Sequence, residues 1–431
     1  MEETREERIE RLTREFRKLL EEKFPEKGST LERIKELTEE IGKAIEEKIE
    51  DSATKQEGTG YVGRHARCEC GSAARYVRIY EKNVVTLHGL RVVPRAYYHC
   101  SACGSGFTPL DVVMGLDKGV TSLRVRGKIA RVAALTPFGR GSNELKELCG
   151  IEVSAKTFER VSEHVGNSIG IELAESEQHI LSGLADEPEA APQRLYVTVD
   201  GAMVPVGKGY RECKVGAVYE ASVDCNGEVA ARDVEHVATM GDAEAIGDRV
   251  YCAAFRGVER AKEVIVVADG GRWIWKQARQ NFPGCVEVLD FYHAAEHLGE
   301  VARAWHGAES PKADKWLDRC KADFLEGRFE RVMKSIRAWK PVDPEHVKLR
   351  SDNIGYFSRN RKRMRYNQFR AQGMHIGSGI AESSCKCLVQ ARLKQSGMHW
   401  SQEGAESILQ LRRLWMDVPS ADFAQYARMA A

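Results

Sequence analysis

The sequence lacks the long apolar segments of membrane proteins and the leader of secreted ones. Its 431 residues contain no apolar run of about 18 or more, the length that a membrane-spanning helix requires. The opening stretch, MEETREERIERLTREFRKLL, has no apolar core of a secretory signal. We therefore expect a cytoplasmic protein that does not insert into a membrane.

The chain also has almost no net charge. Its 65 lysines and arginines nearly balance 64 acids, which leaves a formal charge of +1. A field from the whole molecule that attracts nucleic acid is thus excluded, and any DNA binding must use local patches. One such patch runs from Arg359 to Lys394, where nine basic residues surround a single acid, Glu382.

Dense cysteine spacing, the sign of a small disulfide scaffold, is missing too, although the chain has 12 cysteines. Four of them form two pairs, Cys68-x-Cys70 and Cys100-x-x-Cys103, within a strand-rich stretch at 61–111. Four thiolates from two turns suit tetrahedral Zn²⁺, and the glycine after each pair lets the backbone donate to the sulfurs. We predict a zinc ribbon with one structural Zn²⁺. Alternative ligands are His65 and His99.

Charged helices are predicted before this ribbon. Residues 1–55 alternate acids and bases around apolar residues at helical spacing, such as Ile9 and Leu12. Helices that pack on another part of the chain are one interpretation, and a dimerising coiled coil is the other.

A helix-turn-helix is predicted after the ribbon, over 118–185. Three helical stretches follow one another there, and Ser154 is placed to cap the third. Recognition helices present their first turns to the major groove, and the first turn here carries Lys156, Thr157 and Arg160. A three-helix unit without DNA contact is the alternative.

The middle of the chain predicts a mixed sheet. Three strand-like runs, RLYVTVDGAMVPV, ECKVGAVYEASVD and GEVAARDVEHVA, precede a helix and then alternate strands and helices. The order β-β-β-α-β-α-β-α is that of a ribonuclease-H-like fold. We predict its first part at 192–304, an all-helical insertion at 305–375, its last part at 376–416 and a tail at 417–431.

Three acids in this core are candidate catalytic residues. Asp200 and Asp269 each end an apolar strand and precede a glycine, where the chain can turn sharply, and Glu382 lies on a later helix. Neighbouring strands would bring them together as an all-oxygen site for two Mg²⁺ or Mn²⁺ ions. The alternatives are strand-end turns for the aspartates and an i,i+4 ion pair with Lys386 for Glu382.

The chain resembles the DDE transposases of bacterial insertion sequences, specifically the Kra family, from about residue 60 to 416. The resemblance includes CECGSAARYV, RAYYHCSACGSGFTPLD, VTVDGAMVPV, VVADGGRWIW, VLDFYHAAEHL, YFSRNRKRMRYNQFRAQGMHIGSGIAESSCK and RLKQSGMHWSQEGAESILQLR. It implies that Asp200, Asp269 and Glu382 form the D-D-E triad. After the first aspartate the family more often has Gly-Thr-Gly, whereas this chain has Gly-Ala-Met.

Further residues are expected to assist. Asp290 and His293 match a C/D-x-x-H signature of related transposases, which implies that they position the site or flanking DNA. His293 as a proton shuttle, or as a core histidine, are the alternatives. Trp400 and the pair Trp273 and Trp275 suit stacking on bases, with core packing as the alternative for the pair.

These observations predict an α/β multidomain transposase that cleaves phosphodiesters and joins 3′-hydroxyl ends to target DNA. Its partners would be double-stranded DNA, namely terminal repeats and target, and further copies of itself in a dimer or higher assembly on the bacterial nucleoid. A transposase-derived DNA-binding regulator and a metal-dependent nuclease without strand transfer are the alternatives. The predicted DNA contacts are Lys156, Thr157, Arg160, Arg361, Lys362, Arg363, Arg365, Arg370, Lys386, Arg392, Lys394 and Trp400.

Overall fold

The computed structural model describes residues 4–23, 30–116, 119–186, 192–223, 229–255, 257–258 and 260–429. The chain divides into two compact units, each treated by itself below. The first comprises Met1–Arg126 and Asn143–Val153, and the second comprises Gly127–Ser142 and Ser154–Ala430. The predicted helix-turn-helix segment is therefore divided between the two units.

The first unit begins with the two predicted charged helices, α1 (Arg5–Lys23) and α2 (Leu31–Gln56). The later turns of α2 contact the following hairpin, because Glu46 lies 2.7 Å from Nδ1 of His88 and Glu50 lies 3.4 Å from Nε of Arg91. Part of α2 thus packs on its own chain. Whether these helices also form a dimer stays a prediction.

A four-stranded antiparallel sheet follows, with its strands in chain order. Its core is divided into two small clusters, one with Ala74, Ala96 and Tyr98 beside two of the cysteines and one with Val84, Val93, Leu110 and Leu116. This small buried apolar area contributes little to the stability of the sheet. Domains with so small a core usually need a metal or disulfides to fold stably. The elements are β1 (His65–Arg67), β2 (Ala73–Thr86), β3 (Gly89–His99), β4 (Gly106–Phe107) and the short helix α3 (Pro109–Met114).

Three helices occupy the predicted helix-turn-helix segment: α4 (Leu123–Ala133), α5 (Phe138–Cys149) and α6 (Ala155–Leu181). Ser154 caps α6 as predicted, since its hydroxyl accepts a hydrogen bond of 3.1 Å from the Thr157 amide. The middle of α6 packs closely on α16 (Gln402–Asp417). A Cβ on Gly166 would lie 2.2 Å from the carbonyl oxygen of Ser407, so this approach requires glycine.

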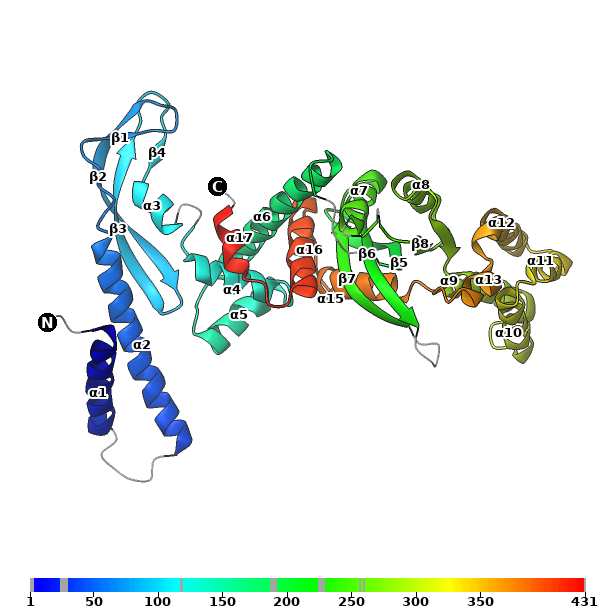
Figure 1. Cartoon of the computed structure of the whole chain (residues 1–431), viewed down its shortest axis with the longest axis horizontal. Coiled ribbons are helices and arrows are strands. Elements are labelled where there is room, and N and C mark those ends of the chain that lie inside the picture. Colours follow the sequence, from blue (N-terminus) through cyan, green and yellow to red (C-terminus); the bar gives the residue numbers. More distant parts are fainter. Residues whose placement is uncertain are drawn as a thin grey trace. The chain divides into compact units, whose positions relative to one another are not determined.

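The second unit contains a five-stranded sheet whose order is β7-β6-β5-β8-β9. Figure 1 labels β7, β6, β5 and β8 of this sheet. The first three strands are antiparallel, and β8 and β9 extend the sheet in parallel to β5. This strand order and these directions agree with the order read from the sequence. The strands are β5 (Arg194–Val206), β6 (Gly209–Val223), β7 (Val229–Thr239), β8 (Glu263–Ala268) and β9 (Val286–Leu289).

Successive side chains along a strand point to opposite faces of the sheet. Helices cover both of these faces. Val197 and Val199 of β5 face Ile246 of α7 and Ile274 of α8. Asp200 points to the other face, where Cys385 contacts it. The helices that follow the strands are α7 (Ala243–Ala254), α8 (Arg272–Asn281) and α9 (Phe291–His306).

The predicted insertion is helical throughout its regular structure, and it shares a continuous apolar core with the sheet. Its elements are α10 (Pro311–Leu325), α11 (Phe329–Ala338), α12 (Pro344–Asn360), the 3₁₀ turn η1 (Arg361–Arg363) and α13 (Tyr366–Ala371). The chain then returns to the sheet through α14 (Gly379–Ser384), the π-helix η2 (Cys385–Gln390) and α15 (Ala391–Leu393), and α17 (Phe423–Met429) ends the described chain. None of the described helices combines the length and apolar character needed to cross a membrane.

Candidate functional site

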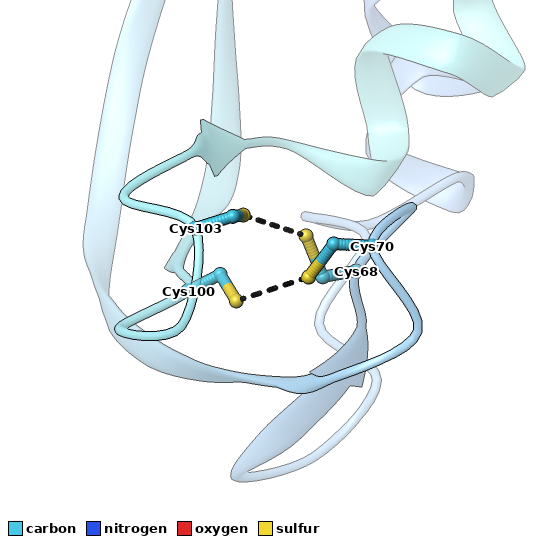
Figure 2. A group of neighbouring side chains, drawn as sticks. All are labelled: Cys68, Cys70, Cys100 and Cys103. Atoms are coloured by element: carbon cyan, nitrogen blue, oxygen red, sulfur yellow. Dashed lines mark hydrogen bonds between the residues drawn. The ribbon is translucent and has the colours of Figure 1, made fainter.

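The four predicted cysteine ligands meet at one end of the first sheet (Figure 2). Cys68 and Cys70 follow β1, Cys100 and Cys103 follow β3, and antiparallel pairing brings both turns together. All four sulfurs lie within 4.8 Å of one another. The pairs across the two turns, Cys68–Cys103 and Cys70–Cys100, are 3.6 and 3.7 Å apart.

These distances fit a tetrahedral metal. Zn–S bonds of about 2.3 Å place the ligands of a tetrahedral site about 3.8 Å apart. The cysteine cluster can therefore hold a metal ion such as zinc. Neither His65 nor His99 belongs to this cluster. Among the described residues, the group of potential metal ligands whose atoms all lie within 4.8 Å of one another consists of the four cysteines.

The turns favour the thiolate form, which metal binding needs, at two of the four cysteines. At Cys68 the Cys70 amide lowers the pKa, but burial and the neighbouring sulfurs outweigh it and raise the pKa to about 12. The hydroxyl and amide of Ser105 lower the pKa of Cys103 to about 6. The amide and hydroxyl of Ser72 lower the pKa of Cys70. The donors to sulfur thus include these serines and, at Cys68, the Cys70 amide. Each glycine closes its turn instead with a positive φ, 85° at Gly71 and 75° at Gly104.

Three aspartates form a row at one edge of the second sheet. Val199 of β5 pairs with Ala268 of β8, which pairs with Leu289 of β9. The residue that follows each of these three in the chain is an aspartate, namely Asp200, Asp269 and Asp290. The register therefore brings the two predicted catalytic aspartates together, with a third acid beside them.

Asp200 is in an environment that disfavours its negative charge. Burial raises its pKa, and the charge of Asp269 raises it further, against the opposing effects of the Gly201 amide, the Cys385 thiol and His293. Asp269 accepts a hydrogen bond of 2.8 Å from the Gly271 amide. Two neighbouring carboxylates of this kind suit Mg²⁺ or Mn²⁺, because a divalent cation offsets their repulsion.

The sharp turn predicted after each aspartate exists at only one of them. β8 ends at Ala268, and Gly270 and Gly271 lead into α8. β5 continues past Asp200 to Val206, so the turn prediction was wrong there. The reason is that β6 remains paired with β5 as far as Val206, beyond the end of β8.

Glu382 lies on α14, which packs against β5 and β6. Its side chain is 67% exposed and lies 2.6 Å from Nζ of Lys386, the ion pair considered as the alternative from the sequence. Among the described residues Glu382 does not form a close ligand cluster with the two aspartates. Its helix is therefore beside the sheet, but its carboxylate is directed to the lysine.

Asp290 and His293 differ sharply in their surroundings. Asp290 is buried, caps α9 through the amides of Tyr292 and His293, and accepts hydrogen bonds from Ser378. The His293 ring is half-buried, and its Nδ1 lies 3.6 Å from Glu296. Neither residue's predicted role is tested by these contacts.

Most of the predicted DNA contacts are exposed. Lys156 and Arg160 are exposed on the first turns of α6, and Thr157 is half-buried beside them. Arg363 is held internally, with its guanidinium 2.8 Å from Asn360 and 4.4 Å from the ring centre of Trp275. The other exposed basic residues of the set are Arg361, Lys362, Arg365, Arg370, Lys386 and Lys394.

Two predicted DNA contacts lie in the interior instead. Arg392 is fully buried, and its guanidinium lies 5.0 and 5.1 Å from the ring centres of Phe138 and Trp400. Trp400 is 7% exposed and donates a hydrogen bond to the Leu393 carbonyl. Their positions correct the prediction, because neither side chain reaches solvent, and the cation–π stack explains why an arginine can be buried there.

Sequence reasoning missed two residues beside the aspartate row. The Cys385 thiol lies 3.4 Å from Oδ2 of Asp200. Tyr356, from the insertion, covers Gly270, where a Cβ would lie 2.1 Å from its ring. Burial raises the pKa of this tyrosine, and so do the charges of Asp269 and Asp290. No sequence signal marks either residue, because both approach from elements distant in the chain.

Comparison with known proteins gives a distant match. No family model matches the chain. The chain is similar to a curated protein named "UPF0236 protein in vanSb 3'region" from Streptococcus gallolyticus, at 23% identity over 318 residues. The match covers 70% of this chain and 66% of that protein, so the chain spans just under two thirds of its relative's length.

Proposed function

We propose that this chain is a DNA transposase of the D-D-E type, with Asp200, Asp269 and Glu382 as its catalytic acids. The observation that carries the proposal is the strand register, which aligns Asp200 with Asp269 at one sheet edge. The packing of the Glu382 helix on the same sheet supports it. So do the ribonuclease-H-like strand order and the sequence resemblance over the same segments.

Asp200 and Asp269 would hold divalent cations, and Glu382 would join them after leaving Lys386. Two bound Mg²⁺ or Mn²⁺ ions supply an activated water or 3′-hydroxyl and stabilise the leaving oxygen of a phosphodiester. The protein's own contribution is to fix both aspartates on neighbouring strands, where backbone amides orient them. His293, half-buried next to the row, would position the site or flanking DNA, or alternatively move a proton during the reaction.

The DNA would be held by basic residues around this edge. Exposed lysines and arginines of the insertion and of the segment after Glu382 would contact phosphates, which carry no sequence information. The first turn of α6, with Lys156 and Arg160, would read terminal repeats, and the zinc ribbon would assist. Because two ends must be processed together, the active form would be a dimer or larger assembly.

A cleavage and strand-transfer assay tests the proposal. The substrate is DNA from the sequence flanking the gene, with Mg²⁺ or Mn²⁺, and the variants are Asp269→Asn and Glu382→Gln. Asp318→Asn, an exposed aspartate on α10, is the matched control. We expect cuts at a repeated end and covalently joined products with the native chain and the control, and neither with the two triad variants.

Other outcomes distinguish the alternatives. Cuts without joined products would favour a metal-dependent nuclease. Binding of terminal DNA that is equal in all variants, without any cut, would favour a DNA-binding regulator and would refute the catalytic triad.

A further inference from the structure

Asp290 stands in the same row as the two proposed catalytic aspartates, yet its oxygens are already engaged. Oδ1 accepts hydrogen bonds of 2.7 and 3.4 Å from the Tyr292 and His293 amides at the start of α9. Oδ2 accepts from both the amide and the hydroxyl of Ser378, with the amide at 3.1 Å. With both oxygens bonded and only 7% of the residue exposed, Asp290 is poorly placed to bind a metal.

Ser378, which donates to Asp290, does not cap the helix that follows it. It is the residue before α14, where a serine side chain usually accepts a hydrogen bond from the helix and contributes about 1 kcal/mol. Here it makes no such bond, and its hydroxyl is directed to Asp290 instead. A residue that breaks a local rule is often serving function, and the helix that loses the bond is the one that carries Glu382.

The stretch from Ser378 to Glu382 is short, and its start is bonded to the start of α9. Gly377 and Gly379 flank Ser378, and a Cβ on Gly377 would lie 2.7 Å from the Tyr292 ring, so the backbone passes close to α9 there. Two backbone bonds complete the connection, from the Phe291 amide to the Ile376 carbonyl at 2.9 Å and from the Glu382 amide to the Ser378 carbonyl at 3.1 Å. Asp290 is thus linked through Ser378 to the backbone of Glu382.

We infer that Asp290 is a positioning residue that fastens the start of the Glu382 helix to the sheet edge through Ser378. The inference rests on the proposed function, and it makes Asp290 a support for the third catalytic acid rather than a ligand of the metal. It assigns Ser378 the same role. Outer groups that orient a ligand typically change metal affinity about 10- to 100-fold when they are removed.

Hydrogen exchange of the full chain tests the contact without reference to activity. Ser378→Ala removes the hydroxyl but leaves the amide donor, and Ser378→Thr retains a hydroxyl. Asp290→Asn removes the charge but also alters the cap of α9, which makes Ser378→Ala the cleaner variant. Ser383→Ala, an exposed serine on the same helix, is the control.

In Ser378→Ala we expect the amides of residues 378–382 to exchange at least about tenfold faster, with little change in Ser378→Thr or Ser383→Ala. The double variant of Asp290→Asn and Ser378→Ala should exchange no faster than Asp290→Asn alone, because both changes break one contact. Native exchange in Ser378→Ala, or additive effects in the double variant, would overturn the inference.

The cleavage assay adds a readout that a merely structural role would not affect. In Ser378→Ala the Mg²⁺ concentration for half-maximal cleavage should rise about tenfold, while the thermal midpoint stays within about 2 °C. An unchanged Mg²⁺ requirement would refute the positioning role. If the native chain cleaves no DNA, the proposed function fails, whereas the exchange result still decides whether Asp290 fastens this segment.

Discussion

The two candidate metal sites of this protein are built in opposite ways. The cysteine cluster is assembled from two turns of one small sheet, and its four sulfurs already have the spacing of a tetrahedral ion's ligands. The carboxylate site draws on two strands and a helix that is distant in the chain, and its third acid is bound to a lysine. The cysteine ligands already lie close together, whereas the carboxylate site requires Glu382 to leave Lys386 before it can join the two aspartates.

This difference has an energetic counterpart. Two of the thiols, Cys70 and Cys103, have pKa values that their turns lower, whereas the pKa of Cys68 is raised to about 12, so ionisation before a metal binds is favoured at part of the cluster. Asp200 has a raised pKa because it is half-buried and lies near Asp269. We interpret the first site as a source of stability. The second is a place where folding tolerates an unfavourable charge for the sake of function.

The largest expected effect is loss of the cysteine site. Cys100→Ser should lower the zinc content from about one ion per chain to nearly none and remove hydrogen-exchange protection from β2 and β3. The reason is that structural zinc contributes on the order of 10 kcal/mol, and the apolar core of this sheet is small. Zinc analysis and exchange of the full chain measure both results.

Cys149→Ser is the matched control, because Cys149 is exposed on α5 and outside the cluster. A strong chelator should reproduce the effect of Cys100→Ser in the native chain. Full protection of β2 and β3 after complete zinc removal would show that the sheet is stable without its metal, and the contrast between the two sites would disappear.

The carboxylate site should respond in the opposite direction. Asp200→Asn is expected to lower cleavage at least about 1,000-fold and, without metal, to raise the thermal midpoint by about 1–2 °C. The pKa of Asp200 is raised in the folded protein, so its ionised form opposes folding above that pKa, and protonation at lower pH removes the penalty. The midpoint difference should therefore shrink as the pH falls.

Asp318→Asn, on the exposed surface of α10, should change neither cleavage nor the midpoint. A clear loss of stability in Asp200→Asn would mean that the carboxylate supports the fold. The site would then resemble the cysteine cluster in that respect.

The sequence predicted those features that depend on neighbours in the chain. The cysteine pairs, the strand runs and the Ser154 cap are local, and each was found where its pattern placed it. The i,i+4 partner of Glu382 was also visible in the spacing. Local patterns of this kind carry their own geometry, because a turn or a helix fixes the positions of residues a few places apart.

Features that join distant segments could not be predicted. Ser378 and Asp290 are 88 residues apart, and Cys385 and Asp200 are 185 apart. The burial of Arg392 was missed because a basic residue in a basic run is normally exposed, and only the fold supplies its two aromatic neighbours. The missing turn at Asp200 depends likewise on how far β6 extends.

A smaller effect is expected from the lysine that holds Glu382. Lys386→Gln should free the carboxylate and lower the Mg²⁺ concentration for half-maximal cleavage by about two- to fivefold. The change is modest because both side chains are exposed and solvent screens their attraction. Cleavage must be measured at saturating DNA, since Lys386 is also a predicted phosphate contact. Lys394→Gln, an exposed lysine nearby, is the control, and an equal change in both variants would argue against a specific restraint on Glu382.

The smallest expected effect concerns Cys385, a thiol that lies beside the carboxylates. Cys385 donates a weak hydrogen bond to Oδ2 of Asp200 and so lowers the pKa of that carboxyl. Cys385→Ala should therefore raise the pKa of Asp200, shift the acidic limb of the cleavage profile to higher pH and increase the Mg²⁺ requirement about twofold. Cys385→Ser retains a donor and should behave like the native chain, and Cys213→Ala controls for lost volume at a buried cysteine of β6. If Cys385→Ala instead removed zinc or unfolded the chain, the thiol would belong with the structural cysteines. A shift of the pH profile alone would mean that Cys385 acts on the carboxylate site, through its hydrogen bond to Asp200, and not as a ligand of a structural metal.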